Sequence, residues 1–367
     1  MKLISITSFS RIMALAILLT IISSLICPKA SAISAKGAVL IDATYGRVLM
    51  QHNANTKLGP ASTTKIMTAL IALENAPLDK TITATNTIYQ SEGTSLYLKV
   101  GEQMTLEDAL YGLLLESGND VALAIAESIG GSVDNFVDMM NKKCYELGLS
   151  NTHFVNPHGL SDDEHYTTAY DLAQITRQAL KNNTFCQIIS TKKKTISGDR
   201  VLDNHNKLLD TYPNANGVKT GYTKATGRTL VSSATRDELT LIAVTLNDGD
   251  DWADHAEMLD YGFDNYKKVT VNKKGDYLST QVTGKGKYLG LVASSDVILV
   301  ANDKEIEGIQ YEYTNGKVYA KYNGTFLGEG NTTVVGSNRE NKNENSDSNT
   351  RTKTFWNSFF KLISWVV

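Results

Sequence analysis

The stretch Pro60-Ala61-Ser62-Thr63-Thr64-Lys65-Ile66-Met67-Thr68-Ala69-Leu70-Ile71 places a serine and a lysine at the start of an apolar-faced segment. Its apolar side chains recur every three to four positions, which predicts a helix over Thr63–Asn75. Lys65 then lies on the same helix face as Ser62, within reach of its hydroxyl. Lysine can act as the base that a nucleophilic serine needs where burial lowers the lysine pKa toward neutrality. The stretch therefore predicts an activated serine at the first turn of a buried helix.

The S-x-x-K spacing recurs in this chain at Ser190–Lys193 and at Ser358–Lys361. Ser190 leads into a run of lysines that is typical of a solvated surface, and Ser358 lies in the final apolar segment. Only Ser62 opens an apolar-faced helix, whose N-terminal N–H groups can also stabilise developing negative charge. Context therefore selects Ser62 and Lys65 as the predicted nucleophile and base.

Two further short motifs follow along the chain. Ser117-Gly118-Asn119 lies between two predicted helices, where a loop can project a hydroxyl and an amide into a cleft. Lys219-Thr220-Gly221 comes before a predicted strand, and its glycine allows a backbone or a ligand to approach closely. Each tripeptide alone is typical of an ordinary turn or strand end. Their order and context favour one site shared with Ser62.

The surrounding pattern predicts strands at both ends of a helical block. Strands at Gly37–Ile41 and Arg47–Met50, joined across Thr44–Gly46, form a predicted hairpin. Beyond the first helix, helical spacing predicts three more, at Thr105–Glu116, Asp120–Ile129 and Asn135–Leu147. Strands return at Arg228–Val231 and Leu239–Val244. We therefore expect one α+β domain over residues 33–265, whose sheet combines strands from both ends.

The pattern changes to short β segments after Tyr266. Asn315-Gly316 and Asn323-Gly324 mark two tight hairpins in this part of the chain. Residues 267–335 are therefore expected to form a small all-β domain, with no clustered acid, base or nucleophile. At 367 residues the chain has room for two or three domains at about 150 residues each.

Both ends of the chain are expected to lie outside these domains. Residues 1–32 read as a signal peptide, because basic residues precede an apolar run that ends at Ala30-Ser31-Ala32. Residues 336–353 read as a disordered linker, and residues 354–367 as an amphipathic helix too short to cross a bilayer. We therefore expect an exported protein held peripherally at the outer face of the cytoplasmic membrane.

Composition adds two limits. The formal net charge of −3 gives no general attraction to nucleic acid, so no nucleic-acid partner is expected. Cleavage after Ala32 would leave two cysteines, Cys144 and Cys186, either as buried thiols or as a pair.

Residues 33–265 resemble the low-molecular-weight penicillin-binding proteins, the serine D-alanyl-D-alanine carboxypeptidases of peptidase family S11. Beyond the three motifs, the resemblance rests on stretches in family order: Gly93-Thr94-Ser95, Ser117-Gly118-Asn119-Asp120, Asn156-Pro157-His158-Gly159-Leu160, Thr168-Ala169-Tyr170-Asp171-Leu172 and Gly217-Val218-Lys219-Thr220-Gly221-Tyr222-Thr223. It implies a β-lactamase and transpeptidase-like α+β domain, followed by a small β domain. It also implies peptidoglycan stem peptides as substrates, β-lactam antibiotics as acylating ligands, and no cofactor.

The resemblance also implies residue roles. The implied catalytic residues are Ser62, Lys65, Ser117 and Asn119. The implied substrate-binding residues are Lys219, Thr220, Gly221 and Tyr222. Ser62 would be acylated with Lys65 as its base, while Lys219 and Thr220 would receive the terminal carboxylate. The oxyanion would lie between the backbone N–H groups of Ser62 and Tyr222.

Three alternative functions compete with this one. A zinc peptidase is suggested by the nearby side chains His153, His158, Asp162, Asp163 and His165. The sequence holds no H-E-x-x-H helix, and a loop-bracing role for His158 is simpler, so no metal is expected. A β-lactamase would need a base for rapid deacylation that we cannot assign. A non-catalytic wall-binding protein would keep the groove without turnover.

Overall fold

The computed structural model describes residues 33–282 and 288–336. The expected signal peptide, C-terminal linker and amphipathic helix lie outside the described residues. The described residues from Ala35 onward belong to one compact unit. Within it are two large antiparallel sheets, each with its own apolar core.

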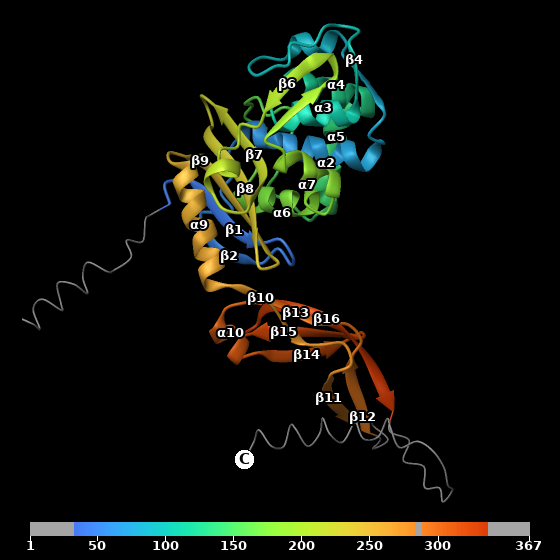
Figure 1. The fold of residues 1–367 in the computed structure, drawn as a ribbon, viewed down its shortest axis with the longest axis vertical. Coiled ribbons are helices and arrows are strands. Elements are labelled where there is room, and N and C mark those ends of the chain that lie inside the picture. The colour runs from blue at the N-terminus through green and yellow to red at the C-terminus, as the bar shows by residue number, and fades with distance from the viewer. Residues whose placement is uncertain (1–32, 283–287, 337–367) are drawn as a thin grey trace, which may run out of the picture. The chain divides into compact units, whose positions relative to one another are not determined.

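The first sheet has five antiparallel strands (Figure 1). In spatial order they are β2 (Val48–His52), β1 (Gly37–Asp42), β9 (Leu239–Asp248), β8 (Gly227–Arg236) and β7 (Ala215–Thr223). The predicted hairpin is confirmed, with Gly46 at a φ of 74° in the turn between β1 and β2. Strands from both ends of the predicted domain therefore share this sheet, and β7 lies at its edge.

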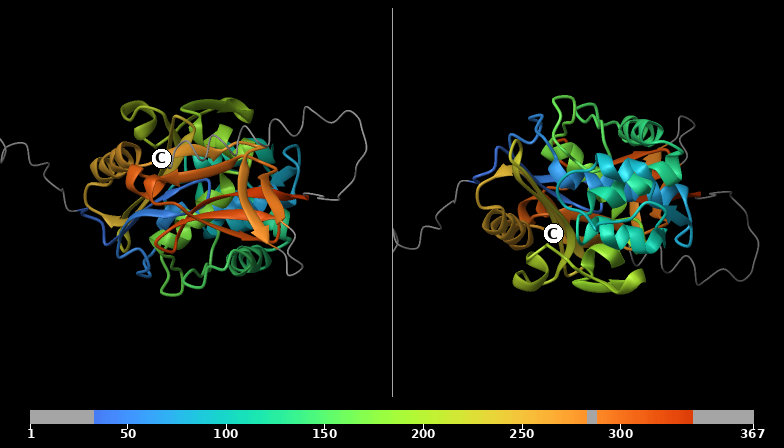
Figure 2. Two further views of the ribbon diagram at one scale, coloured as in Figure 1. Left: turned by 90° about the horizontal axis from the view of Figure 1, so that it is seen from below. Right: turned by 90° about the horizontal axis from the view of Figure 1, so that it is seen from above.

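Alternate side chains of this sheet face two different layers, as expected where both faces are covered. Val39 and Ile41 of β1 join the large core formed with the helices. Leu40, between them, faces α9 (Asp251–Asn265), because a Cβ on Gly262 would lie 2.8 Å from Leu40 Cδ2. The end views of Figure 2 show the sheet between the orange-yellow α9 and the cyan helices.

The helical layer contains all four predicted helices. Its elements are η1 (Ala61–Thr64), α2 (Lys65–Asn75), η2 (Asn86–Gln90), α3 (Leu106–Leu114), α4 (Asn119–Gly130), α5 (Val133–Glu146), α6 (Ala169–Ala179) and α7 (Asn183–Ser190). Thr105 caps the N-terminus of α3, because its Oγ1 accepts a hydrogen bond from Asp108 N at 3.1 Å. Short elements complete the layer: β3 (Thr81–Thr83), β4 (Gln103–Thr105), β5 (Lys193–Ile196), η3 (Ser197–Asp199), β6 (Arg200–Asp203) and α8 (Leu208–Thr211).

The second sheet is built entirely from residues after Tyr266. Its main path is β10 (Lys267–Asn272), β13 (Val297–Ala301), β16 (Thr325–Gly336), β12 (Tyr288–Ala293) and β11 (Tyr277–Val282). Two further strands complete the sheet: β15 (Lys317–Tyr322) pairs with β16, and β14 (Gln310–Thr314) pairs with β15. The short helix α10 (Asp303–Glu307) lies between β13 and β14 along the chain. Both predicted Asn-Gly turns are present, with all four residues at positive φ, as two-residue hairpin turns require. The expected fold class, α+β followed by β, is therefore confirmed.

Two further sequence questions are settled within the described residues. Cys144 and Cys186 are free thiols, and burial raises the pKa of Cys144 to about 12. None of the helices in residues 33–282 and 288–336 has the length and apolar character that a bilayer span requires.

Candidate active site

Ser62 lies in the one-turn helix η1, which leads directly into α2. Pro60 O anchors this turn by accepting hydrogen bonds from Thr63 Oγ1 at 2.6 Å and from Thr229 Oγ1 at 3.0 Å. Thr229 belongs to β8, so the anchor joins the nucleophile turn to the sheet. Ala61, immediately before the serine, has a φ of 50°, a left-handed conformation that is uncommon for a residue with a side chain.

Lys65 lies under the nucleophile, and its side chain is fully buried. Its Nζ lies 3.1 Å from Ser62 Oγ, 2.6 Å from Asn119 Oδ1 and 2.7 Å from His158 O. The predicted one-turn spacing between serine and lysine is thus confirmed as a direct contact. The sequence did not predict His158 O as a partner, since a backbone carbonyl leaves no signature in side-chain identity.

The surroundings of Lys65 favour its neutral form. Burial is the largest cause that lowers the pKa of Lys65 well below 10.5, and the positive charge of Lys219 lowers it further. Asp120 opposes both effects. The unprotonated amine, which can accept a proton from Ser62, is therefore accessible closer to neutral pH than for an exposed lysine.

The Ser117-Gly118-Asn119 motif lies at the junction of α3 and α4, close to the predicted position. Ser117 has a φ of 62°, and Asn119 is the first residue of α4. In the described part of the chain, Ser117 Oγ is buried and has no hydrogen-bond partner. A hydroxyl in this state is available to a substrate or a water molecule.

Asp120 organises the loop that covers this side of the site. Its carboxylate accepts hydrogen bonds from Leu96 N and Leu98 N, each at 3.0 Å, and from Ser95 Oγ at 2.7 Å. Asn119 Nδ2 donates to Glu92 O in the same loop. Because Asn119 Oδ1 also contacts Lys65, the loop and the base are linked through one side chain.

Lys219-Thr220-Gly221 lies within β7, whereas the sequence predicted that it precedes a strand. The apolar pattern begins only at β8, because β7 is an edge strand that packs against the nucleophile turn. A Cβ on Gly221 would lie 3.0 Å from Ser62 N, so a side chain there would crowd the predicted oxyanion donor. Tyr222, the next residue, is exposed.

Lys219 is the second buried lysine of the site. It is 1% exposed, and its Nζ donates to Thr220 O at 3.0 Å. Burial lowers the pKa of Lys219 from 10.5 to about 7, and Glu116 acts in the opposite direction. Its charge therefore depends on pH near neutrality.

The histidines named in the zinc alternative make hydrogen bonds within loops, which is the loop-bracing role expected for His158. His158 Nδ1 accepts from Leu160 N at 3.2 Å, and His165 bridges Thr64 Oγ1 and Val155 N. Among residues 33–282 and 288–336, no group of three or more His, Cys, Asp or Glu side chains could hold a metal ion.

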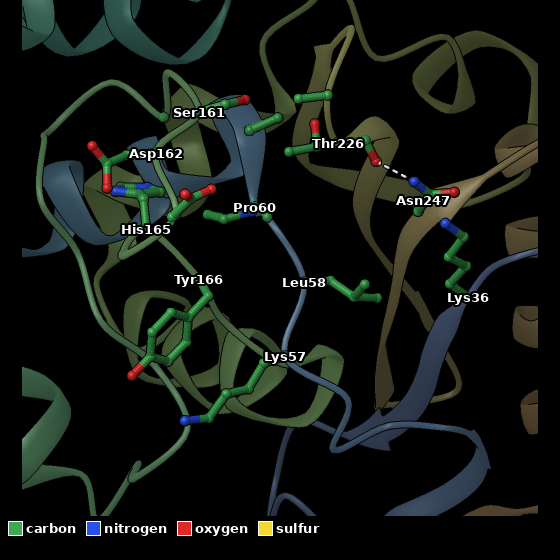
Figure 3. Close-up of a pocket in the computed structure, with 15 residues that line it drawn as sticks. Lys36, Lys57, Leu58, Pro60, Ser161, Asp162, His165, Tyr166, Thr226 and Asn247 are labelled. Carbon is green, nitrogen blue, oxygen red and sulfur yellow. Dashed lines mark hydrogen bonds between the residues drawn. The ribbon is translucent and has the colours of Figure 1, made fainter.

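A cavity of about 370 Å³ lies behind the nucleophile turn (Figure 3). Pro60 and Ala61 form one wall, and Asp162, His165 and Asn247 line other parts. Neither Ser62 nor either buried lysine lines it. The cavity is therefore adjacent to the catalytic constellation and separate from it.

Known families and curated proteins include clear relatives of this chain. The family model described as D-alanyl-D-alanine carboxypeptidase, peptidase S11, matches residues 25–250. The D-alanyl-D-alanine carboxypeptidase DacF of Bacillus subtilis (strain 168) is 36% identical over 295 residues, covering 76% of this chain and 75% of DacF. DacA of Escherichia coli (strain K12) is 32% identical over 304 residues, covering 78% of this chain and 75% of DacA.

Solved structures show the same relationship. Penicillin binding protein 5 from Haemophilus influenzae superposes with a TM-score of 0.72 at 28% identity, covering 84% of this chain and 98% of that chain. A point mutant of the Streptomyces K15 DD-transpeptidase superposes with a TM-score of 0.61 at 33% identity, covering 64% of this chain and 99% of that one. The β-lactamase and non-catalytic alternatives are not favoured by these findings. The chain belongs to the D-alanyl-D-alanine carboxypeptidases of peptidase family S11, and it is a serine hydrolase.

Proposed function

We propose that this protein removes the terminal D-alanine from peptidoglycan stem pentapeptides through an acyl-enzyme on Ser62. One observation carries the assignment of the nucleophile: the buried Lys65 Nζ lies within hydrogen-bond distance of both Ser62 Oγ and Asn119 Oδ1. A base in this position can take the serine proton as the hydroxyl attacks.

The reaction then follows in two halves. Ser62 Oγ attacks the carbonyl carbon of the penultimate D-alanine while its proton passes to Lys65. The oxyanion forms between the N–H groups of Ser62 and Tyr222. Collapse breaks the peptide C–N bond, and a proton delivered through Lys65 and Ser117 lets D-alanine leave as an amine. Water then hydrolyses the ester and returns the hydroxyl to Ser62.

The edge strand β7 supports a role in substrate binding. An extended peptide can pair with a free strand edge, and Lys219 lies on this strand, buried beside the nucleophile turn. We assign Lys219 and Thr220 to the C-terminal carboxylate of the substrate. The Asn119 amide and the Ser117 hydroxyl orient the peptide from the opposite wall.

Penicillin would enter the same first half-reaction. Ser62 Oγ attacks the β-lactam carbonyl, and the C–N bond that breaks is part of the ring. The amine therefore remains attached to the acyl group, and the ester persists in the site.

Release of D-alanine from a soluble pentapeptide tests the proposal. The wild-type chain should release one D-alanine per peptide, while Ser62→Ala should release none and should fail to bind penicillin covalently. Ser190→Ala, which removes the serine of the other described S-x-x-K sequence, should keep wild-type turnover. Covalent penicillin binding without D-alanine release would instead identify a non-catalytic binding protein, and rapid penicillin turnover would identify a β-lactamase.

We further propose that the protein is exported and held at the outer face of the cytoplasmic membrane by its C-terminal segment. The support is the sequence alone: a leader ending at Ala32, and polar residues Asn357, Lys361 and Ser364 at helical spacing in an otherwise aromatic and aliphatic end. The expected substrate also lies outside the cytoplasm.

A further inference from the structure

The cavity behind the nucleophile turn adjoins the end of β7, the strand assigned to substrate binding. Thr226, in the turn between β7 and β8, lines this cavity, and so does Ser161. Thr223, the last residue of β7, joins the two, because its Oγ1 lies 2.8 Å from Ser161 Oγ and 2.8 Å from Thr226 Oγ1. The rim of the cavity therefore continues the line of the substrate-binding strand.

In the proposed reaction a peptide runs along β7 in one direction. Its C-terminal carboxylate lies at Lys219 and Thr220, and its reacting carbonyl oxygen lies at Tyr222 N. The residue upstream of that carbonyl therefore lies beyond Tyr222, toward Thr223 and the turn at residues 224–226. In a stem pentapeptide this upstream residue is the third, a diamino acid with a charged side chain.

Charged side chains of both signs surround the cavity. Lys36 and Lys57 bring positive charge, and Asp162 and Asp163 bring negative charge. Asp162 and Lys36 lie on opposite sides of the cavity (Figure 3). None of these four side chains forms an ion pair with another residue that the structure describes. The rim can therefore offer partners to a cation and to an anion at once.

Two of these charges are oriented by contacts that do not neutralise them. Lys57 Nζ lies 4.4 Å from the centroid of the Tyr166 ring. Asp162 Oδ1 accepts a hydrogen bond from Glu164 N at 2.8 Å. His165 also lines the cavity but carries no charge near neutral pH, because burial lowers its pKa to about 4. The positive charge of the lining therefore comes from the two lysines.

We propose that this rim is the subsite for the third residue of the stem peptide and selects a side chain that ends in both an ammonium and a carboxylate. The ammonium lies at Asp162 and Asp163, and the carboxylate lies at Lys36 and Lys57. The inference rests on the proposed function, which sets the direction of the peptide. All four side chains are exposed, so each ion pair contributes little alone and is weakened by salt.

The measurement is kcat/KM for D-alanine release from three soluble pentapeptides that differ only at the third residue. That residue is meso-diaminopimelate, with an ammonium and a carboxylate; lysine, with an ammonium alone; or the uncharged norleucine. The wild-type chain should prefer the diaminopimelate peptide to the norleucine peptide by about threefold to tenfold, with the lysine peptide between them. Added salt should reduce this preference.

Two double variants divide the subsite into its halves. Lys36→Met with Lys57→Met should remove the advantage of the diaminopimelate peptide over the lysine peptide. Asp162→Asn with Asp163→Asn should remove the advantage of the lysine peptide over the norleucine peptide. Each preference is a ratio within one variant, so a general change in turnover cancels. One penicillin adduct per chain shows that a variant is folded at its nucleophile, and the single substitutions replace a double variant that does not label.

Lys207→Met and Asp79→Asn are the matched controls, because both residues are exposed and neither lines the cavity. They should keep the wild-type preferences, and an equal loss in them would reduce the effect to net charge. Equal kcat/KM for the three peptides in the wild-type chain would overturn the inference. So would preferences that survive both double substitutions, because recognition would then lie elsewhere. A wild-type chain that releases D-alanine from none of the peptides would instead refute the proposed function.

Discussion

Gly159 packs directly on the backbone of Ala61, the residue before the proposed nucleophile. A Cβ on Gly159 would lie 1.9 Å from Ala61 O and 3.0 Å from Ser62 N. The preceding carbonyl, His158 O, accepts from Lys65 Nζ at 2.7 Å. The same two residues therefore shape the nucleophile turn and orient its base.

Gly159→Ala adds only one methyl group, but it should disturb the site strongly. The substitution places a methyl group inside the space of Ala61 and forces a side chain onto a φ of 93°. We expect a loss of at least about 2 kcal/mol in the free energy of unfolding, and acylation by penicillin slowed by about tenfold or more. Urea denaturation and acylation kinetics measure the two effects.

Gly148→Ala is the matched control for backbone strain. Gly148 has a φ of 72°, but a Cβ there would meet nothing within 4 Å. This variant should lose stability through the left-handed conformation alone and acylate at the wild-type rate. Equal effects of the two substitutions on acylation would contradict the proposed packing role of Gly159.

Lys65→Ala should preserve the fold but reduce acylation of Ser62 by about 10²-fold or more, the scale of losing a positioned general base. Lys65→Arg should not recover the rate, because a guanidinium does not give up its proton in proteins. Mass spectrometry of the penicillin adduct supplies both the rate and the modified residue. Acylation of Lys65→Arg at the wild-type rate would assign the base to another group.

The motif residues could be predicted because the types of their side chains and their spacing along the chain indicate their chemistry. Helical periodicity was sufficient to predict that Ser62 and Lys65 lie on the same helix face, within contact distance. It could not predict His158 O or the crowding at Gly159, because both depend on a backbone that arrives from a distant loop. The hydrogen bonds that Asp120 accepts from three residues of one loop could not be predicted from the sequence either. An acidic residue in the first turn of a helix is already explained by its favourable interaction with the helix dipole.

The strand β7 was missed for a different reason. Edge strands need not alternate cleanly, and Lys219 is a buried charged residue in a position where periodicity predicts an apolar one. The sequence therefore singled out the Lys219-Thr220-Gly221 motif, but not the strand in which the motif lies. Such conflicts between local pattern and final structure are expected at functional residues.

Lys219→Ala should discriminate between substrates that differ only at their C-terminus. Lys219 is assigned to the terminal carboxylate, so removing it should lower kcat/KM for a free-acid pentapeptide more than for the corresponding amide. The expected difference is about tenfold or more, as for loss of a charge-assisted hydrogen bond. Proportional losses on both peptides would limit Lys219 to a structural or proton-transfer role.

Truncation after Val335 should release the protein from membranes without changing turnover of soluble peptide. No proposed catalytic residue lies beyond Tyr222, so only attachment should be affected. Replacing Phe359 and Phe360 by serine should have the same effect in the full-length chain, through loss of apolar surface at the interface. Sedimentation with vesicles and D-alanine release measure attachment and turnover. A truncated chain that still sediments would point to an uncleaved N-terminal segment, and loss of turnover would contradict the tether.

Acidification should destabilise the folded chain through its buried histidines. Burial lowers the pKa of His255 to about 3, of His158 to about 3 and of His165 to about 4. In the unfolded chain each titrates near 6.5, so the unfolded state takes up protons first as pH falls. The contribution of these histidines to the free energy of unfolding is therefore complete above about pH 6.5. It decreases as the pH falls toward the folded pKa, by up to about 1.4 kcal/mol per pH unit for each histidine.

His255 offers the sharpest test of this pH dependence, because it is fully buried behind the sheet and takes no part in the proposed chemistry. Its imidazole ring forms hydrogen bonds with Ser232 Oγ at 2.6 Å and with Thr245 Oγ1 at 3.0 Å. His255→Asn should be less stable than wild type at pH 7, yet lose about 1.6 kcal/mol less between about pH 6.5 and pH 5, because the titrating group is gone. The exposed His52→Asn is the control and should follow the wild-type pH dependence. Parallel curves for His255→Asn and wild type in urea denaturation would show that His255 is protonated in the folded state, contrary to its burial.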